Sequence, residues 1–322
     1  MGDNILNQPV FGWLNSSFTR RDFLKNQIKA SLYMAAGMSG LILPKTVFSD
    51  PVPDIAVAKG SPSAATRAAV EIMGGMKRFV KPGSRVLIKP NMSFPNPPEW
   101  ATTTNPEVVK ELALMCKEVG AKKVLIADYT LFRPDECLKR AGIFDMCDKI
   151  EDISVVTVNN ERLYRDIDFP GAGIMSQNGV LNDALKADVL IAVPVAKTHT
   201  ATGVSLSMKG MMGLVWDRSG MHSKGLSSCI VDMCGILKAD LTVIDGINVL
   251  STRGPRGPGK VLKENMIIAS RDMVAADAYA VSAFEWYGKK YKPAQVEHIR
   301  MAHERGLGRM DIENMNVKKV VI

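Results

Sequence analysis

The sequence predicts an α/β protein with a mostly parallel sheet, helices on both faces of that sheet, and a small irregular insert over the carboxyl edge of the strands. Two observations lead to this prediction. Short apolar runs alternate with longer segments of helical period, which is the chain order of βαβ units. The apolar runs are continuously rich in Val, Ile and Leu, and strands of that composition are covered on both faces. With 322 residues, 46% of them hydrophobic, the chain is long enough to bury a large core.

Seven apolar runs are the predicted strands, and they lie at 54–58, 85–89, 123–128, 154–158, 188–193, 241–245 and 266–270. Segments with a helical period lie between several of them, at 63–80, 105–120, 133–144 and 273–288. The helix at 105–120 has the clearest ends, because Asn105 can cap it, Pro106 suits its first turn and Gly120 can stop it. The segments 159–187 and 205–235 have no clear period, so we expect them to be irregular and to form the insert.

The first 49 residues have the pattern of an export signal. Thr19-Arg20-Arg21-Asp22-Phe23-Leu24-Lys25 resembles the core of a twin-arginine signal, and a modest apolar stretch follows it before a boundary near Ser49. An amphipathic helix is one alternative. A membrane anchor is another, although the apolar stretch is shorter than the ~20 residues that span a bilayer. We therefore predict a signal at 1–49, recognised by the twin-arginine translocase, and a single α/β domain at 50–322. The protein would be periplasmic, or membrane-tethered if the signal is not cleaved.

Charge and cysteine usage exclude two classes of protein. The formal net charge is +8, but part of it lies in the signal, and no block of Lys and Arg is interleaved with aromatic residues. Nucleic acid is therefore not an expected partner. The five cysteines form no C-x-x-C pair, and the spacing of Cys229 and Cys234 fits neither a zinc nor a ferredoxin pattern. We expect Cys116 and Cys137 to be small core residues, and a single disulfide is left open.

Polar or ionisable side chains follow four of the predicted strands, at Lys89 and Asn91, at Asp128, at Lys197 and His199, and at Asp245. The carboxyl ends of parallel strands meet at one edge of a sheet, and ligands bind beyond that edge. We therefore expect these side chains to converge on one pocket, with Pro194 ending the pairing of its strand and exposing the lysine and histidine that follow. Each residue also has a structural interpretation, such as a lysine stem over apolar surface or an aspartate in a turn.

Four further residues are candidates for ligand binding. Thr104 directly precedes a helix start, where free N–H groups favour anions. Lys209 lies in the Gly- and Met-rich stretch 208–213, where backbone can approach a ligand closely. His222 and Arg256 lie in Gly-rich loops, and loops placed by a scaffold often carry function. A solvated turn is the alternative interpretation for Arg256.

These residues together predict a site for an anionic small molecule or for a metal cofactor. Lys197 and His199 are the candidate catalytic groups, because both residue types transfer protons. The candidate ligand-binding residues are Lys89, Asn91, Thr104, Lys209, His222 and Arg256. Asp128 and Asp245 would hold a metal or orient the lysines. We expect Lys209 or His222, from the stretch 205–235, to cover the pocket.

The same motifs occur in an order that resembles the prokaryotic domain of unknown function 362 (DUF362). The motifs are "VLIKPN", "VLIAVPVAKTH", "MKGMMG", "VIDGI", "GPRGPG" and "SRDMVAADAYA", and the resemblance covers roughly residues 54–290. Members of that family are often described as possible iron–sulfur proteins, because many carry a ferredoxin-like extension. This sequence has no clustered cysteines, so we do not expect an iron–sulfur cluster of its own, and the sequence leaves the cofactor open.

Two functions are consistent with these expectations. The first is an exported protein with an enzyme-like or cofactor-dependent site for an anionic molecule or metal, associated with redox chemistry. The second is a non-catalytic periplasmic binding or accessory subunit of a redox complex, in which a partner protein supplies the iron–sulfur segment. The sequence does not identify the reaction.

Overall fold

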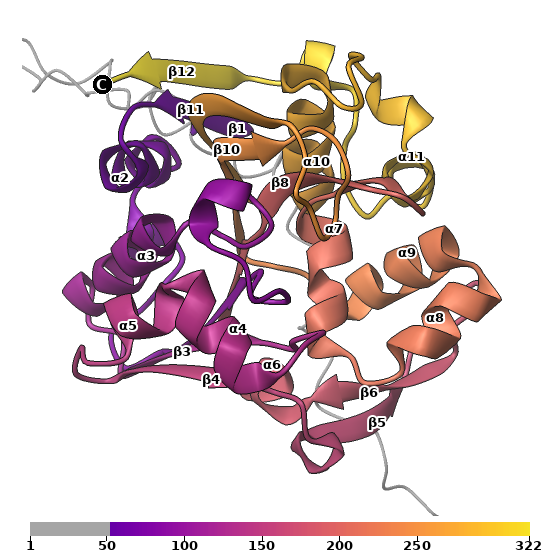
Figure 1. The fold of residues 1–322 in the computed structure, drawn as a ribbon, viewed down its shortest axis with the longest axis horizontal. Helices are drawn as coiled ribbons and strands as arrows, with labels where there is room; N and C mark the ends of the chain where they lie inside the picture. Colours follow the sequence, from indigo (N-terminus) through magenta and orange to yellow (C-terminus); the bar gives the residue numbers. More distant parts are fainter. Residues whose placement is uncertain (1–51) are drawn as a thin grey trace, which may run out of the picture. The chain divides into compact units, whose positions relative to one another are not determined.

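A ten-stranded sheet forms the centre of the computed structural model, which describes residues 52–322 (Figure 1). Its main path, from one edge to the other, is β12 (Val317–Val321), β1 (Ile55–Lys59), β11 (Val261–Ser270), β10 (Leu241–Leu250), β7 (Val189–Val193), β2 (Arg85–Pro90), β3 (Lys123–Asp128) and β4 (Ile153–Thr157). The strands from β10 to β4 run parallel, as does the β1–β12 pair, whereas β11 is antiparallel to both of its neighbours. The predicted mostly parallel sheet is confirmed.

Helices cover both faces of this sheet, as predicted. Successive residues of β2 show this directly, because Val86 and Ile88 belong to one hydrophobic core and Leu87 to another. The first core is covered by α2 (Pro62–Ile72), α3 (Pro106–Glu118) and α5 (Ile143–Cys147). The second is covered by α7 (Ser207–Gly210), α9 (Leu226–Ile236), α10 (Met273–Ala283) and α11 (Glu297–Glu304). Each fully buried aliphatic side chain contributes roughly 1.5–3 kcal/mol to folding, which explains the continuous apolar composition of the strands.

The ends of the helices follow from local sequence. The Asn105 side chain accepts a hydrogen bond from the Glu107 N–H at 2.9 Å and so caps α3, with Pro106 in its first turn. Asp272 caps α10 in the same way, by accepting from two backbone N–H groups. The predicted helix at 133–144 is divided, because Gly142 adopts a φ of 74° between α4 (Pro134–Ala141) and α5. The other predicted helices end earlier than expected.

The strand that precedes Pro194, β7, ends at Val193 as predicted, but the expectation that Lys197 and His199 are exposed beyond it is wrong. The chain resumes as β8 (Val195–His199), which runs parallel to β10, and then turns back as β9 (Gly203–Ser205), antiparallel to β8. Proline removes one backbone donor, and the ladder continues past it because the next residue, Val195, pairs with Asp245 of the extended β10. Lys197 is therefore a buried strand residue with 1% exposure, and is not exposed at the sheet edge.

The two segments expected to be irregular are ordered. Residues 159–187 contain a separate antiparallel pair, β5 (Tyr164–Asp168) with β6 (Gln177–Leu181), followed by α6 (Asn182–Lys186). Residues 205–235 form α7, the 3-10 helix η4 (Met211–Leu214), α8 (Arg218–Lys224) and most of α9. The helical period of α9 is hard to recognise because apolar residues lie nearly all around it. Figure 1 shows these elements grouped beside the central sheet.

The described residues form one compact unit. None of its helices combines the length and the apolar character that crossing a membrane requires. All five cysteines are buried, and none of them forms a disulfide. The predicted signal at 1–49 lies outside the described residues.

Candidate functional site

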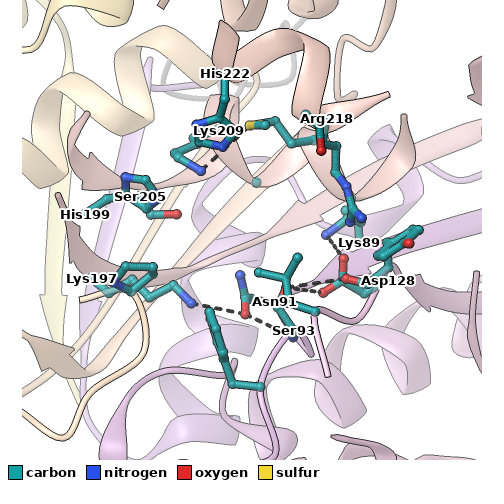
Figure 2. A pocket seen from close by; sticks show the side chains of 18 residues that line it. Lys89, Asn91, Ser93, Asp128, Lys197, His199, Ser205, Lys209, Arg218 and His222 are labelled. Carbon is teal, nitrogen blue, oxygen red and sulfur yellow. Dashed lines mark hydrogen bonds and ion pairs between the residues drawn. The ribbon is translucent and has the colours of Figure 1, made fainter. Parts of the chain in front are cut away.

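A cavity of about 220 Å³ lies beyond the carboxyl ends of β2 and β3, between β8 on one side and α7 and α8 on the other (Figure 2). Seven of the residues singled out from the sequence line it, namely Lys89, Asn91, Asp128, Lys197, His199, Lys209 and His222. They come from the ends of three strands and from two short helices, α7 and α8. The structure therefore brings the strand-end residues of β2, β3 and β8 to one place, and their individual roles stay predictions.

The other three candidate residues do not line the cavity. The Thr104 hydroxyl donates to the Val193 carbonyl oxygen at 2.7 Å and accepts from the Asn91 N–H at 2.8 Å, so it fixes the loop after β2. Asp245 is buried and accepts from the Asn105 N–H at 2.7 Å, which secures the start of α3. Arg256 is exposed, with its guanidinium 5.7 Å from the centre of a neighbouring aromatic ring.

Burial raises the pKa of Asp245 to about 6. Its carboxylate lies within β10 and its hydrogen bonds go to backbone, so the structure does not gather it with Asp128. Among residues 52–322, no group of three or more His, Cys, Asp and Glu side chains is placed to hold a metal ion. The donor set of the cavity thus fits a metal poorly.

A buried ion pair forms the floor of the site. Lys89 Nζ lies 2.6 Å from Asp128 Oδ1, and both side chains are at most 2% exposed. The other carboxylate oxygen accepts from the Met92 N–H at 2.6 Å and from the Ser93 hydroxyl at 3.3 Å. Backbone of η4 lies against this pair, because a Cβ atom on Gly213 would be 2.5 Å from Lys89 Cε. The glycine in "MKGMMG" thus permits a close approach.

The amine of Lys197 is buried among uncharged acceptors. Its Nζ donates to Thr102 O at 2.5 Å and to Asn91 Oδ1 at 3.1 Å, and it lies 4.8 Å from the centre of the Phe94 ring. Burial, reinforced by the positive charges of Lys209 and Lys89, holds the pKa of Lys197 well below its ordinary value, although Asp128 opposes this. The lysine amine is therefore much easier to deprotonate than a solvent-exposed one.

His199 is neutral over the ordinary pH range. Burial and the charges of Lys209 and Lys197 lower its pKa to about 3. Its Nδ1 accepts a hydrogen bond from the Ala201 N–H at 3.2 Å. In a neutral ring whose Nδ1 is an acceptor, Nε2 carries the hydrogen, so His199 can donate a hydrogen bond through Nε2.

Lys209 and Arg218 supply the least constrained positive charges of the cavity. Among residues 52–322, the one polar contact of Lys209 Nζ is with Met212 Sδ at 3.7 Å, which is a weak acceptor. Burial and the charge of Arg218 lower the pKa of Lys209 to about 8. The Arg218 guanidinium lies 3.2 Å from the centre of the Tyr129 ring, and its buried Nε has no hydrogen-bond partner in the same range of residues.

Sequence reasoning missed several residues of the cavity, including Ser93, Phe94, Tyr129, Ser205 and Arg218. Two signals were present. The first is that Tyr129 directly follows the last residue of β3. The second is that Arg218 precedes His222 by four residues, so Arg218 and His222 lie on the same face of α8. Ser205 had no such signal, because β9 reaches the cavity only through its pairing with β8.

Two solved structures are similar to parts of this chain. The lactate racemase apoprotein of Thermoanaerobacterium thermosaccharolyticum matches with a TM-score of 0.39 and 15% identity, over 65% of this chain and 54% of that one. A protein of Thermotoga maritima matches with a TM-score of 0.36 and 14% identity, over 82% of this chain and 52% of that one. The chain spans about half the length of each.

A sequence relative and a protein family are also similar to the chain. The thylakoid-associated protein sll1697 of Synechocystis sp. is 28% identical over 226 residues, which make up 68% of this chain and 68% of that protein. Residues 86–282 match the family described as "Domain of unknown function (DUF362)", and this range contains every residue that lines the cavity. Because the match extends over more than half of its length, the chain belongs to the DUF362 family.

Proposed function

We propose that this protein is exported and binds a small anionic molecule in the cavity, where Lys197 and His199 act on it by hydrogen bonding and proton transfer. One observation carries the proposal. Four basic side chains, Lys89, Lys197, Lys209 and Arg218, line a cavity to which the described residues contribute one carboxylate, that of Asp128. Within the described part of the chain, only Lys89 of these four is paired with a carboxylate. Even with Lys197 neutral, Lys209 and Arg218 leave the cavity with an excess of positive charge, because Asp128 balances Lys89 alone. A buried excess of positive charge is unfavourable unless an anion neutralises it.

The size of the cavity supports a small ligand. Its volume of about 220 Å³ is below the roughly 300–1,000 Å³ that is usual for sites of drug-sized molecules. Hydroxyl and amide groups of Asn91, Ser93 and Ser205 lie among the charges and can orient a polar ligand. A compact carboxylate or phosphate ester fits these properties.

Hydrogen bonding supports complementary roles for the two candidate catalytic residues. A neutral lysine amine has two hydrogens, and Lys197 donates to two acceptors, Thr102 O and Asn91 Oδ1. Its lone pair is then free to accept a proton from a ligand, while His199 donates through Nε2. The proposed reaction step is thus a proton removal beside a negatively charged oxygen, and redox association would come from the compound handled or from a partner protein.

The second function, a non-catalytic accessory subunit, is favoured by a different observation. Apolar side chains are exposed beside the cavity, with Leu131, which lines it, 54% exposed and Phe132 43% exposed. Such a surface suits contact with another protein. Co-purification of a partner that is lost on Phe132→Ser substitution would support this function, whereas turnover by the isolated protein that is lost in Lys197→Ala would support the enzyme.

Binding of an anionic ligand is expected to weaken as pH rises through about 8. The Lys209 ammonium is present below its pKa of about 8 and is lost above it, so an anion is attracted less strongly at higher pH. Calorimetric titration with small mono- and dicarboxylates and with inorganic phosphate, in buffers of different ionisation enthalpy, should also show proton uptake on binding near that pH.

Matched variants make this test specific. Lys209→Met is expected to lower affinity about tenfold or more and to remove the pH dependence, because a charge-assisted hydrogen bond contributes about 1.5–3 kcal/mol. Lys224→Met, at an exposed position of α8, should bind like the parent protein. Equal affinity of all three proteins for every anion tried would contradict the proposal.

Export is proposed from the sequence alone. Changing Arg20 and Arg21 together to lysine is expected to leave the protein in the cytoplasm, whereas Lys29→Arg, which keeps the arginine pair, should not. Fractionation of producing cells followed by immunodetection measures this. Periplasmic recovery of the double-lysine variant in parental amounts would show that the arginine pair is not the export determinant.

A further inference from the structure

Lys209 differs from the other two lysines of the cavity in the contacts of its amine. Lys89 Nζ is held 2.6 Å from Asp128, and Lys197 Nζ donates two hydrogen bonds and is fully buried. Among the described residues, the only polar contact of Lys209 Nζ is the long one with Met212 Sδ, and the lysine side chain is half-buried. Figure 2 shows its nitrogen directed into the space between the His199 side and the Lys89 side of the cavity. It is therefore the lysine whose amine is both accessible and free to react.

The backbone that carries this lysine is held in place by α10. Asp277 of α10 accepts hydrogen bonds from the Ser207 hydroxyl at 2.5 Å and from the N–H groups of Ser207 and Met208, at 2.9 Å and 3.0 Å. These bonds secure the first turn of α7, which carries Lys209. A lysine on a fixed backbone has only its side chain to orient when it meets a bound ligand.

The surroundings favour the neutral, nucleophilic form of the amine. Besides Arg218, the charged and titratable groups around Lys209 are the other lysines of the cavity, the Lys89–Asp128 pair, His199, His222 and the buried His298. With a pKa of about 8, roughly a tenth of Lys209 is unprotonated at neutral pH, against on the order of one in two thousand for an exposed lysine. Desolvation next to another cation is a known way to activate a lysine toward carbonyl carbon.

We propose that Lys209 condenses with the carbonyl group of a small oxo acid held in this cavity and forms an imine. The proposal rests on the proposed function, because anion binding is what brings the carbonyl to the amine. The Arg218 guanidinium lies against the Tyr129 ring, and its Nε has no hydrogen-bond partner among the described residues. This guanidinium would bind the carboxylate of the oxo acid. This assigns the substrate class as an acid that carries both a carboxylate and a ketone or aldehyde.

The condensation is balanced without any further reagent. The Nζ lone pair attacks the carbonyl carbon, a carbon–nitrogen bond forms, and the carbonyl oxygen takes up a proton, for which His199 Nε2–H and the Ser205 hydroxyl are placed around the cavity. The amine gives up one of its two hydrogens, the oxygen leaves as water with this hydrogen and the donated proton, and the proton donor is recharged from solvent. Nζ keeps its second hydrogen, so the product is the protonated imine. The protonated imine withdraws electrons from the neighbouring carbon, so a proton there becomes easier for Lys197 to remove.

Reductive trapping tests this directly. The full-length protein is incubated with glyoxylate, pyruvate or 2-oxoglutarate in the presence of cyanoborohydride, which reduces the imine to a stable secondary amine. Peptide mapping by mass spectrometry then compares modification of Lys209 with that of Lys224, an exposed lysine of the same protein. At least tenfold faster modification of Lys209 by one of these acids, suppressed by propionate, is expected. Propionate has the carboxylate of pyruvate and lacks its carbonyl.

The outcomes separate this inference from the proposed function. If propionate and the oxo acids bind to the protein but Lys209 is not preferentially modified, the imine is overturned and anion binding stands. Absence of both binding and modification would overturn both. Modification of Lys209 that propionate does not suppress would also count against the inference, because the reaction would not take place in the anion site. Lys209→Arg keeps the charge and should bind propionate within a few-fold of the parent while losing the adduct.

Discussion

Asp128→Ala is expected to lower the free energy of unfolding by about 3–5 kcal/mol, because it leaves the Lys89 ammonium buried without its carboxylate. The two charged atoms lie 2.6 Å apart, and both side chains are at most 2% exposed, so water cannot replace the missing partner. The substitution also removes the acceptor of the Met92 N–H and of the Ser93 hydroxyl. Equilibrium unfolding in urea, followed by circular dichroism, measures the loss.

Two further proteins test the cause of this loss. The double variant Lys89→Met, Asp128→Asn has no unpaired charge and should regain most of the stability, although it should bind anions more weakly. Glu304→Ala removes an exposed pair with Arg300 on α11 and should cost about 0.5 kcal/mol or less. If Asp128→Ala costs no more than Glu304→Ala, the buried pair does not stabilise the site.

Gly213→Ala is expected to lower stability by about 1–3 kcal/mol and to weaken anion binding as well. The added Cβ atom would overlap Asp128 Oδ1 and would be 2.5 Å from Lys89 Cε and 2.8 Å from its Nζ. Neither partner can retreat freely, because both are buried and the carboxylate is tied to backbone. The ion pair must therefore shift, and with it the floor of the cavity. Urea unfolding and calorimetric anion titration measure the two effects.

Gly235→Ala is the matched control. It lies in α9 (Leu226–Ile236), no described heavy atom lies within 4 Å of the place that the added methyl group would occupy, and its φ is not positive. It should stabilise the protein by about 0.4–1 kcal/mol through the unfolded state. Unchanged anion binding and stability in Gly213→Ala would show that the backbone of η4 moves to accept a side chain, and that the close approach is not needed.

The residues that reach the cavity from β2 and β3 could be predicted from the sequence. Lys89 and Asp128 follow uninterrupted apolar runs, and parallel strands bring their carboxyl ends to one edge. His222 was expected in a Gly-rich loop, and the structure instead places it in the helix α8. Its neighbour Arg218 was overlooked because 205–235 was expected to be irregular, although a helix over 218–224 places both residues on one face.

Asp245 shows where the local pattern was insufficient. Like Asp128, it is an acid after an apolar run, so the local pattern predicts the same role for both. In the structure β10 continues to Leu250 because β11 pairs along nearly its whole length, and Asp245 therefore lies inside a strand. Its carboxylate accepts a hydrogen bond from the N–H of Asn105 at the start of α3, a residue 140 positions away in the chain.

The sequence by itself determined the alternation of strands and helices, the burial of both sheet faces, and the presence of lysine, histidine and aspartate at strand ends. These properties depend on composition and period within short windows, where backbone sterics and apolar burial act locally. Only the tertiary structure decided which of these side chains meet. Lys197 came to be buried because β8 pairs with β10 beyond Pro194, and Lys209 came to face the cavity because Asp277 secures α7. Both depend on contacts between residues distant in sequence, which no local pattern encodes.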